Sequence, residues 1–165
     1  MDMRMAALAT VTGTLLWAGS GAAQDLTGPE CGPFTLERTQ RSMAFVDLGA
    51  EGKSPGDQRV MRNTLADQDG NELGSVHIIS TLVSEDGPEG EDLLLAQSVV
   101  DLPNGTISYV TLLTVPAADE SPGSAKPNHS AVTGGTGAFA HATGVMTTVT
   151  RDDGVRELSF DLRCG

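Results

Sequence analysis

The segment Val155-Arg156-Glu157-Leu158-Ser159-Phe160-Asp161-Leu162-Arg163 alternates between two sets of side chains. One set holds three large apolar residues and Arg156, and the other is polar except for Val155. A period of two is typical of a β-strand that turns one face towards a core. The turn residues Asp152-Asp153-Gly154 directly precede this segment, so the end of the chain is predicted to form a β-hairpin.

Seven further segments of this kind precede the hairpin turn, separated by short stretches rich in Gly, Pro, Asn and Asp. No long amphipathic helix is apparent, and short connections favour antiparallel neighbours. The chain is therefore predicted to be all-β, with a single domain over residues 24–165. The seven expected strands are Phe34–Asp47, bent near Gln40-Arg41, then Asp57–Ala66, Glu72–Val83, Asp92–Asp101, Thr106–Val115, His129–Thr133 and Thr143–Thr150.

The two cysteines of the mature chain, Cys31 and Cys164, flank the first and the last expected strand. In an exported protein an even number of cysteines usually indicates a disulfide bond, although two buried free thiols are the alternative. In an up-and-down barrel with an even number of strands, the start of the first strand lies beside the end of the last. A disulfide at that seam favours an eight-stranded antiparallel barrel over a sandwich.

A glycine cluster, Val132-Thr-Gly-Gly-Thr-Gly-Ala-Phe139, lies between two expected strands. It contains Gly-x-Gly, but a dinucleotide-binding loop needs a following helix, and here another strand follows. The cluster is therefore predicted to form a sharp corner whose glycines allow positive φ, with Phe139 filling one end of the core.

This cluster, continued by Ala142-Thr-Gly-Val145, resembles the glycine corner of the plant dirigent proteins and the allene oxide cyclase barrel superfamily. The bacterial allene oxide cyclase-like members are similar in further motifs, and the resemblance spans roughly Phe34 to Arg163. These motifs are Phe34-Thr-Leu-Glu37, Val46-Asp-Leu-Gly49, Gly52-Lys-Ser-Pro-Gly-Asp57, Asn63-Thr-Leu65, Asp67-x-Asp-Gly70 and Leu73-Gly74.

The resemblance implies an eight-stranded barrel, often a homotrimer, whose mostly apolar cavity steers a reactive small molecule without metal or organic cofactor. In the plant cyclases a glutamate and an asparagine lie in the cavity, and Glu37 and Asn63 match them as candidate catalytic residues. Thr39 stands where the cyclases have a second asparagine, and Ser80 where they have a cysteine. Both are candidate substrate-binding residues.

The residues themselves leave alternatives open for this site. If Leu36 points into the barrel, Glu37 points out and is a solvated strand residue. An inward Glu37 would have a raised pKa suited to acid–base chemistry, and its outer neighbour Leu36 would need a covering subunit. Asn63 shares its side of the strand with two apolar residues, which makes an inward amide plausible, or it satisfies backbone near a bulge. Tyr109 is a further candidate for hydrogen bonding to a substrate in the cavity.

The net charge of the 165-residue chain is −12, from 22 Asp and Glu against 10 Lys and Arg. Phosphate and anionic lipid repel such a chain, so we expect no nucleic-acid partner, and no membrane partner once the signal is cleaved. Residues 1–23 have the layout of a secretory signal peptide, with one basic residue, a short apolar run and Ala23 at the cleavage site. A membrane anchor is the alternative, but the apolar run is short for one. The mature protein is expected to be secreted or periplasmic.

Metal chemistry is not expected from the sequence. His77, His129 and His141 fit no short zinc motif, and the run Asp67-x-Asp-Gly70 lacks the later glutamate of a calcium loop. We expect the barrel to guide isomerisation or cyclisation of a small hydrophobic molecule by holding it in one conformation. Two other functions stay open, a non-catalytic carrier of an apolar ligand in the cell envelope and a structural barrel with a filled interior. An inward carboxylate and amide would favour catalysis, and a purely apolar cavity would favour the carrier.

Overall fold

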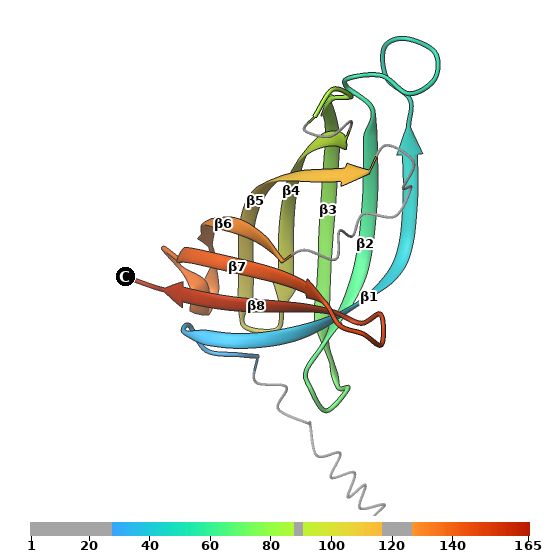
Figure 1. The fold of residues 1–165 in the computed structure, drawn as a ribbon. Coiled ribbons are helices and arrows are strands. Elements are labelled where there is room, and N and C mark those ends of the chain that lie inside the picture. Colours follow the sequence, from blue (N-terminus) through green and yellow to red (C-terminus); the bar gives the residue numbers. More distant parts are fainter. Residues whose placement is uncertain (1–27, 88–90, 117–126) are drawn as a thin grey trace, which may run out of the picture.

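The fold is a closed antiparallel barrel in which eight strands follow one another in chain order (Figure 1). The computed structural model describes residues 28–87, 91–116 and 127–165, so the expected signal peptide at 1–23 lies outside the described residues. All eight expected strands are present, with ends that differ by at most two residues, and the prediction of an all-β barrel is confirmed. The strands are β1 (Pro33–Val46), β2 (Gln58–Ala66), β3 (Glu72–Ser84), β4 (Glu91–Leu102), β5 (Gly105–Pro116), β6 (Asn128–Gly135), β7 (Thr143–Thr150) and β8 (Arg156–Arg163).

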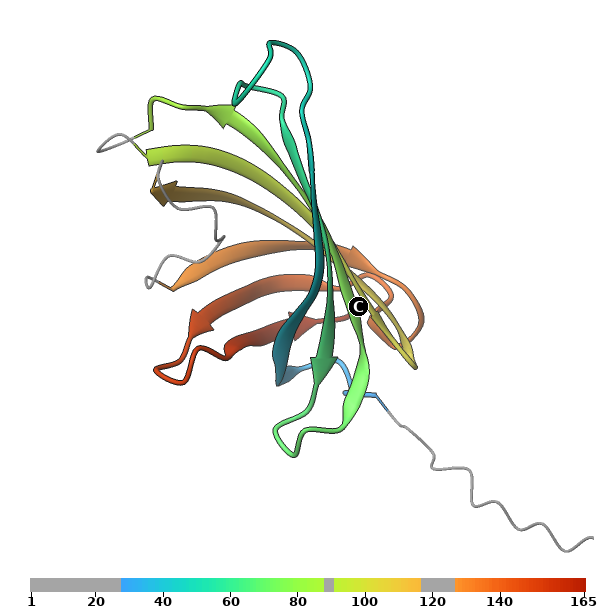
Figure 2. The ribbon, with the colours of Figure 1, turned by 90° about the vertical axis from the view of Figure 1, so that its right-hand side faces the viewer.

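Strand β1 closes the barrel because it pairs with β8 along its first half and with β2 along its second half. The pairing with β8 covers Pro33–Arg38, and the pairing with β2 covers Glu37–Val46. The register shifts between Gln40 and Ser42, which confirms the predicted bend. Beyond this bend β1 follows β2 away from β8, so the wall flares on that side (Figure 2).

A second divergence lies between β5 and β6. Their pairing ends at Val110 and Ala131, whereas β5 itself continues to Pro116. The barrel therefore has one narrow end, where all strands are paired, and one wide end, where β1 to β5 extend beyond β6 to β8 (Figures 1 and 2).

The narrow end is filled by the main hydrophobic core. Phe139 is fully buried there and lies 6.0 Å from Phe34, ring centre to ring centre, and Phe34 stacks on Phe160 at 4.7 Å. The disulfide Cys31–Cys164 joins the start of β1 to the end of β8 beside this core, with the Cα atoms 6.2 Å apart. Both the disulfide and the position of Phe139 confirm the predictions.

The glycine cluster forms the predicted corner between β6 and β7, with a short 3-10 helix at Gly137–Phe139. The corner packs backbone to backbone on the turn between β4 and β5. Gly137 has a φ of +61°, and a Cβ there would lie 2.3 Å from the carbonyl oxygen of Asn104. That same carbonyl accepts a hydrogen bond from the amide of Ala138 at 2.9 Å. Only glycine fits this contact, which explains the motif without a phosphate ligand.

Among the residues that the structure describes, no helix has the length and apolar character needed to cross a membrane.

Candidate functional site

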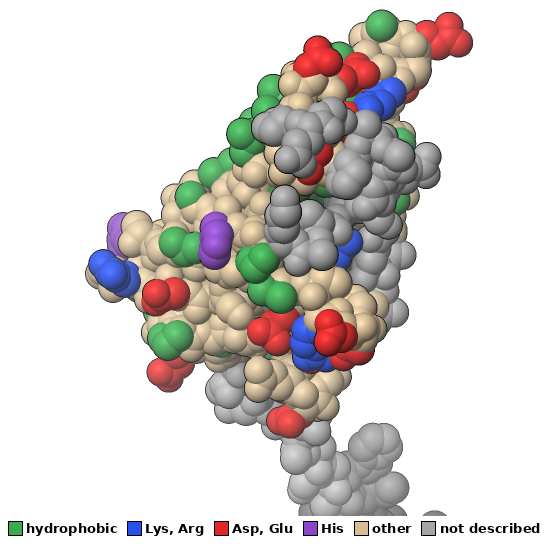
Figure 3. All heavy atoms as spheres, viewed as in Figure 1, with side chains coloured by type: hydrophobic (Ala, Val, Ile, Leu, Met, Phe, Trp, Pro, Cys, Tyr) green, Lys and Arg blue, Asp and Glu red, His purple; other side chains and the backbone are tan. Residues whose placement is uncertain are grey.

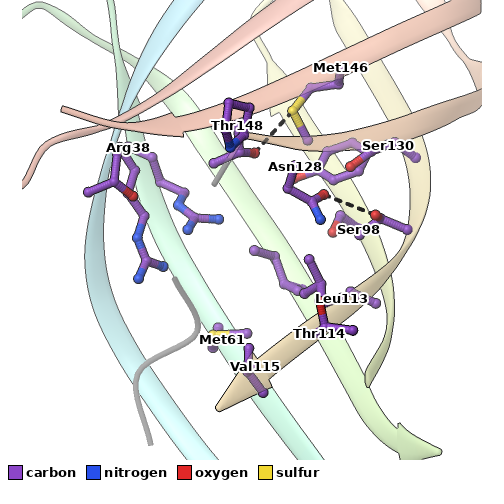
Figure 4. Close-up of a pocket in the computed structure, with 17 residues that line it drawn as sticks. Arg38, Met61, Ser98, Leu113, Thr114, Val115, Asn128, Ser130, Met146 and Thr148 are labelled. Atoms are coloured by element: carbon purple, nitrogen blue, oxygen red, sulfur yellow. Dashed lines mark hydrogen bonds between the residues drawn. The ribbon is translucent and has the colours of Figure 1, made fainter. Parts of the chain in front are cut away.

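The wide half of the barrel contains a cavity of about 210 Å³ between β1, β5, β6, β7 and β8, with β2 to β4 behind it (Figure 4). It lies where the walls diverge, because side chains from facing strands no longer meet there. Its apolar wall is formed by Met61, Ile78, Ala96, Leu113, Val115 and Met146. This cavity is smaller than the roughly 300–1,000 Å³ common for drug-sized ligands, so it suits a compact molecule.

Polar side chains converge on one part of the cavity, at the point where β5 parts from β6. Thr111 donates a hydrogen bond to the amide oxygen of Asn128 at 3.0 Å, and both line the cavity. Ser98 and Tyr109 are neighbours across the β4–β5 pair and are both buried. The remaining polar lining includes Ser130, whose hydroxyl has no partner in the described part of the chain.

Tyr109 is the titratable hydroxyl of this cavity, and only 4% of it is exposed. Burial raises the pKa of Tyr109, against smaller opposing effects of Ser98 and of the positive charge on Arg38. The phenol is therefore neutral at physiological pH and can donate a hydrogen bond. Its ring packs edge-on against Phe160 at 6.4 Å between centres.

Two arginines, Arg38 on β1 and Arg156 on β8, also line the cavity. They are opposite each other across the β1–β8 pair, so their Cα atoms are register partners. No aspartate or glutamate belongs to the described lining. The interior of this acidic protein is thus positively charged at one wall.

The predicted inward orientation of Glu37 is wrong. Leu36 is 1% exposed and lies in the core, so Glu37 points to the outer face. There its carboxylate forms an ion pair with Arg151, outside the cavity. Thr39 shares this outward parity and is exposed, so it lies outside the cavity lining in which its contact with substrate was predicted. The apolar set of β1 simply faces the core, and no covering subunit is needed for Leu36.

Three other predicted residues do point inward. Asn63 is 2% exposed and lies between Met61, which lines the cavity, and Leu65 in the core. Ser80 is 1% exposed, and its hydroxyl has no partner among the described residues. Only Tyr109 is itself part of the cavity lining. The catalytic role of Asn63 and the binding roles of Ser80 and Tyr109 stay predictions.

The sequence prediction missed Arg38 and Arg156, although the signal was present. Arg156 shares the apolar side of the last strand with Leu158, and Arg38 shares the parity of Leu36. An arginine in line with core residues, at the end of an apolar set, indicates a charged group directed into the barrel.

A second hollow, at the far wide end, lies between β2, β4 and the loop from Asp47 to Asp57. Here Lys53 reaches over the barrel rim and pairs with the buried carboxylate of Asp92 at 2.6 Å. The charge of Asp92 is thus compensated within the chain, which makes this hollow a weaker candidate for ligand binding. In the described ranges, no group of three or more His, Cys, Asp or Glu side chains is placed to share a metal ion.

Comparison with known families gives one match. Residues 35–159 match the family described as "Allene oxide cyclase barrel like domain", which covers most of the barrel. No curated protein matches the sequence.

Solved structures of similar fold include several proteins named for reactions of small molecules. The chain is similar to a pyocyanin demethylase, with a TM-score of 0.64 and 21% identity, covering 79% of this chain and 99% of that one. It is also similar to the Diels–Alderase AbmU from Streptomyces koyangensis, with a TM-score of 0.61 and 13% identity over 82% of this chain and 70% of that one. A pterocarpan synthase dirigent protein has a TM-score of 0.51 and 19% identity, over 84% and 90% of the two chains. At these identities the likeness shows a shared fold.

Proposed function

Since this chain belongs to the allene oxide cyclase barrel-like family, we propose that it binds a small organic molecule in the barrel cavity and guides its isomerisation or cyclisation. The observation that best supports this proposal is a cavity of about 210 Å³ with an apolar wall and a few convergent polar groups. Such a cavity can hold a flexible reactant in one conformation, which lowers the barrier for ring closure. The name of the similar Diels–Alderase is in keeping with chemistry of this kind.

Tyr109 is the group that we assign to the chemical step. A neutral phenol in an apolar surrounding can donate a hydrogen bond to a carbonyl or epoxide oxygen as negative charge develops on it. The positive charge of Arg38, which lines the same cavity, also acts on this hydroxyl and favours negative charge on a ligand. Glu37 lies on the outer face, and the proposed chemistry depends on Tyr109 and Arg38 instead of a carboxylate.

Of the other two functions, the structural barrel is the less favoured, because the cavity leaves room for a ligand. The non-catalytic carrier stays the alternative. A purely apolar cavity would favour the carrier, whereas here hydroxyl, amide and guanidinium groups all belong to the lining.

Mass spectrometry gives a direct test, since isomerisation and intramolecular cyclisation leave the mass unchanged. The protein is incubated with a metabolite extract and with any ligand that co-purifies with it. We expect one compound to be consumed while another of identical mass appears. In Tyr109→Phe this conversion should fall by at least about 100-fold, the usual contribution of a general acid, while ligand binding persists.

Ser108→Ala is the matched control, because it removes a hydroxyl from the outward-facing neighbour on the same strand. It should convert the ligand at the wild-type rate. Conversion that is unchanged in Tyr109→Phe would remove Tyr109 from the chemical step. A ligand that is bound but never converted would favour the carrier.

Export is part of the same proposal. It is supported by the signal-like residues 1–23 and by the disulfide, because disulfides form and persist in oxidising compartments.

We further propose that the protein forms a homotrimer through the outer face of β2 to β5. Five exposed apolar residues lie there on four adjacent strands, and Figure 3 shows hydrophobic side chains along the edge where β4 and β5 run. They are Val60, Ile79, Leu95, Val99 and Leu112, each at least 38% exposed. An apolar face that spans adjacent strands is typical of a subunit interface.

Light scattering tests this assembly. We expect a trimer for the wild type and a monomer for the double variant Ile79→Glu/Leu112→Glu, since charge at the centre of the face opposes burial. Val145→Glu, on the outer face of β7, is the control and should stay trimeric. A wild-type monomer at high concentration and moderate salt would contradict the proposal.

A further inference from the structure

Arg38 is a cation held inside the barrel without an acidic partner among the described residues. It follows Leu36 with the same parity on β1, so its side chain extends from the wall into the cavity (Figure 4). Burial lowers the pKa of Arg38 to about 10, with Tyr109 acting against this and the nearby charge of Arg156 adding to it. The guanidinium nevertheless stays protonated at neutral pH.

Arg38 is largely shielded from water, which is an unfavourable position for a charge without a counter-charge. A charge taken out of water costs free energy unless a counter-charge compensates it. Elsewhere the chain does provide one, since Asp92 is paired with Lys53 and Glu37 with Arg151. A second positive charge, Arg156, lies opposite Arg38 on β8 and increases the local potential. Arg156 has further interactions of its own, so the inference rests on Arg38.

The residues around Arg38 indicate which kind of ligand would bind beside its charge. The lining also includes apolar side chains, among them Met61, Leu113 and Met146, which can hold a ring system. Tyr109 lines the same cavity, and its neutral hydroxyl can donate a hydrogen bond to a ligand held there.

We propose that Arg38 is an anion-binding residue of the cavity and that the natural ligand is a compact organic anion, with its charged oxygen at the guanidinium and its rings against the apolar wall. This inference rests on the proposed function, because it names the substrate class of the same site. A carboxylate or an enolate would meet the requirement equally, and both form charge-assisted hydrogen bonds with guanidinium.

Two probes of the same shape separate charge from size. The first is 2-naphthoate, an anion at neutral pH, and the second is the neutral 2-naphthamide. Calorimetric titration of the wild type is expected to show at least about 10-fold tighter binding of the anion, as is common for a buried charge pair. In Arg38→Met this preference should fall to within about 2-fold, while the amide binds as before.

Methionine replaces the aliphatic part of the arginine side chain without its charge, and replacing a buried charge by an apolar group is often neutral for folding. Unchanged binding of the amide by Arg38→Met reports an intact cavity. Arg62→Met removes an exposed arginine from the outer face of β2 and should leave the preference for the anion as in the wild type.

The outcomes are distinguishable. Equal binding of both probes by the wild type, or an anion preference that survives Arg38→Met, would overturn the role of Arg38 and leave the binding cavity standing. Absence of binding for both probes up to their solubility limits would contradict the proposed function and this inference together.

Discussion

Removal of the Cys31–Cys164 disulfide is expected to lower the free energy of unfolding by about 5 kcal/mol in the chain-entropy view. The two cysteines are separated by 133 positions, so the bond closes a loop that includes nearly the whole barrel. Without it the unfolded chain gains a large number of conformations. The double variant Cys31→Ser/Cys164→Ser, compared with the wild type in urea unfolding, measures this loss.

The reduced wild type is the natural control, because it should unfold at the same urea concentration as the double variant. Thiol labelling of the denatured, unreduced protein should find no free cysteine. Two labelled thiols would show that the bond is absent in solution, and a loss below about 1 kcal/mol would show that the folded state gains little from it.

Phe139→Ala is expected to lower the free energy of unfolding by about 3–5 kcal/mol, the range found when a buried aromatic residue is truncated. The Phe139 ring is fully buried at the narrow end, beside Phe34. The corner that carries it is held by backbone contacts with the β4–β5 turn, so the structure has little freedom to close the resulting space.

Phe45→Ala is the matched control, since it removes the same atoms from a side chain that is 57% exposed. Its cost in urea unfolding should stay below about 1 kcal/mol. Similar losses for the two variants would mean that the narrow end is not the tightly packed part of the barrel.

The strands, the barrel and the disulfide could be predicted because each leaves a local pattern. Alternation defines a strand, glycine and aspartate define its turns, and two cysteines at the ends of the pattern define the seam. The corner at Gly137 was predictable for the same reason, since a glycine requirement is a property of a few consecutive residues.

The site was harder to predict, because it depends on which residues from all eight strands meet in space. The alternation of inward and outward side chains along a strand indicates that Arg38 and Tyr109 both point inward. It does not indicate that they lie at the same height in the barrel. That height follows from the register between strands and from the early end of the β5–β6 pairing at Val110. Glu37 shows the opposite case, since a motif match selects a residue, whereas the burial of its neighbour Leu36 determines the direction of the side chain.

The seam between β1 and β8 also determines when the protein can fold. Phe34 and Phe160 are register partners on this seam, and one lies near the start of the chain and the other near its end. The core at the narrow end therefore forms only after the last strand is available, and folding that waits for such distant contacts is slow. Until then β1 and β7 present open edges to other chains. The time between synthesis of β1 and arrival of β8 is thus the period in which this barrel is most exposed to aggregation.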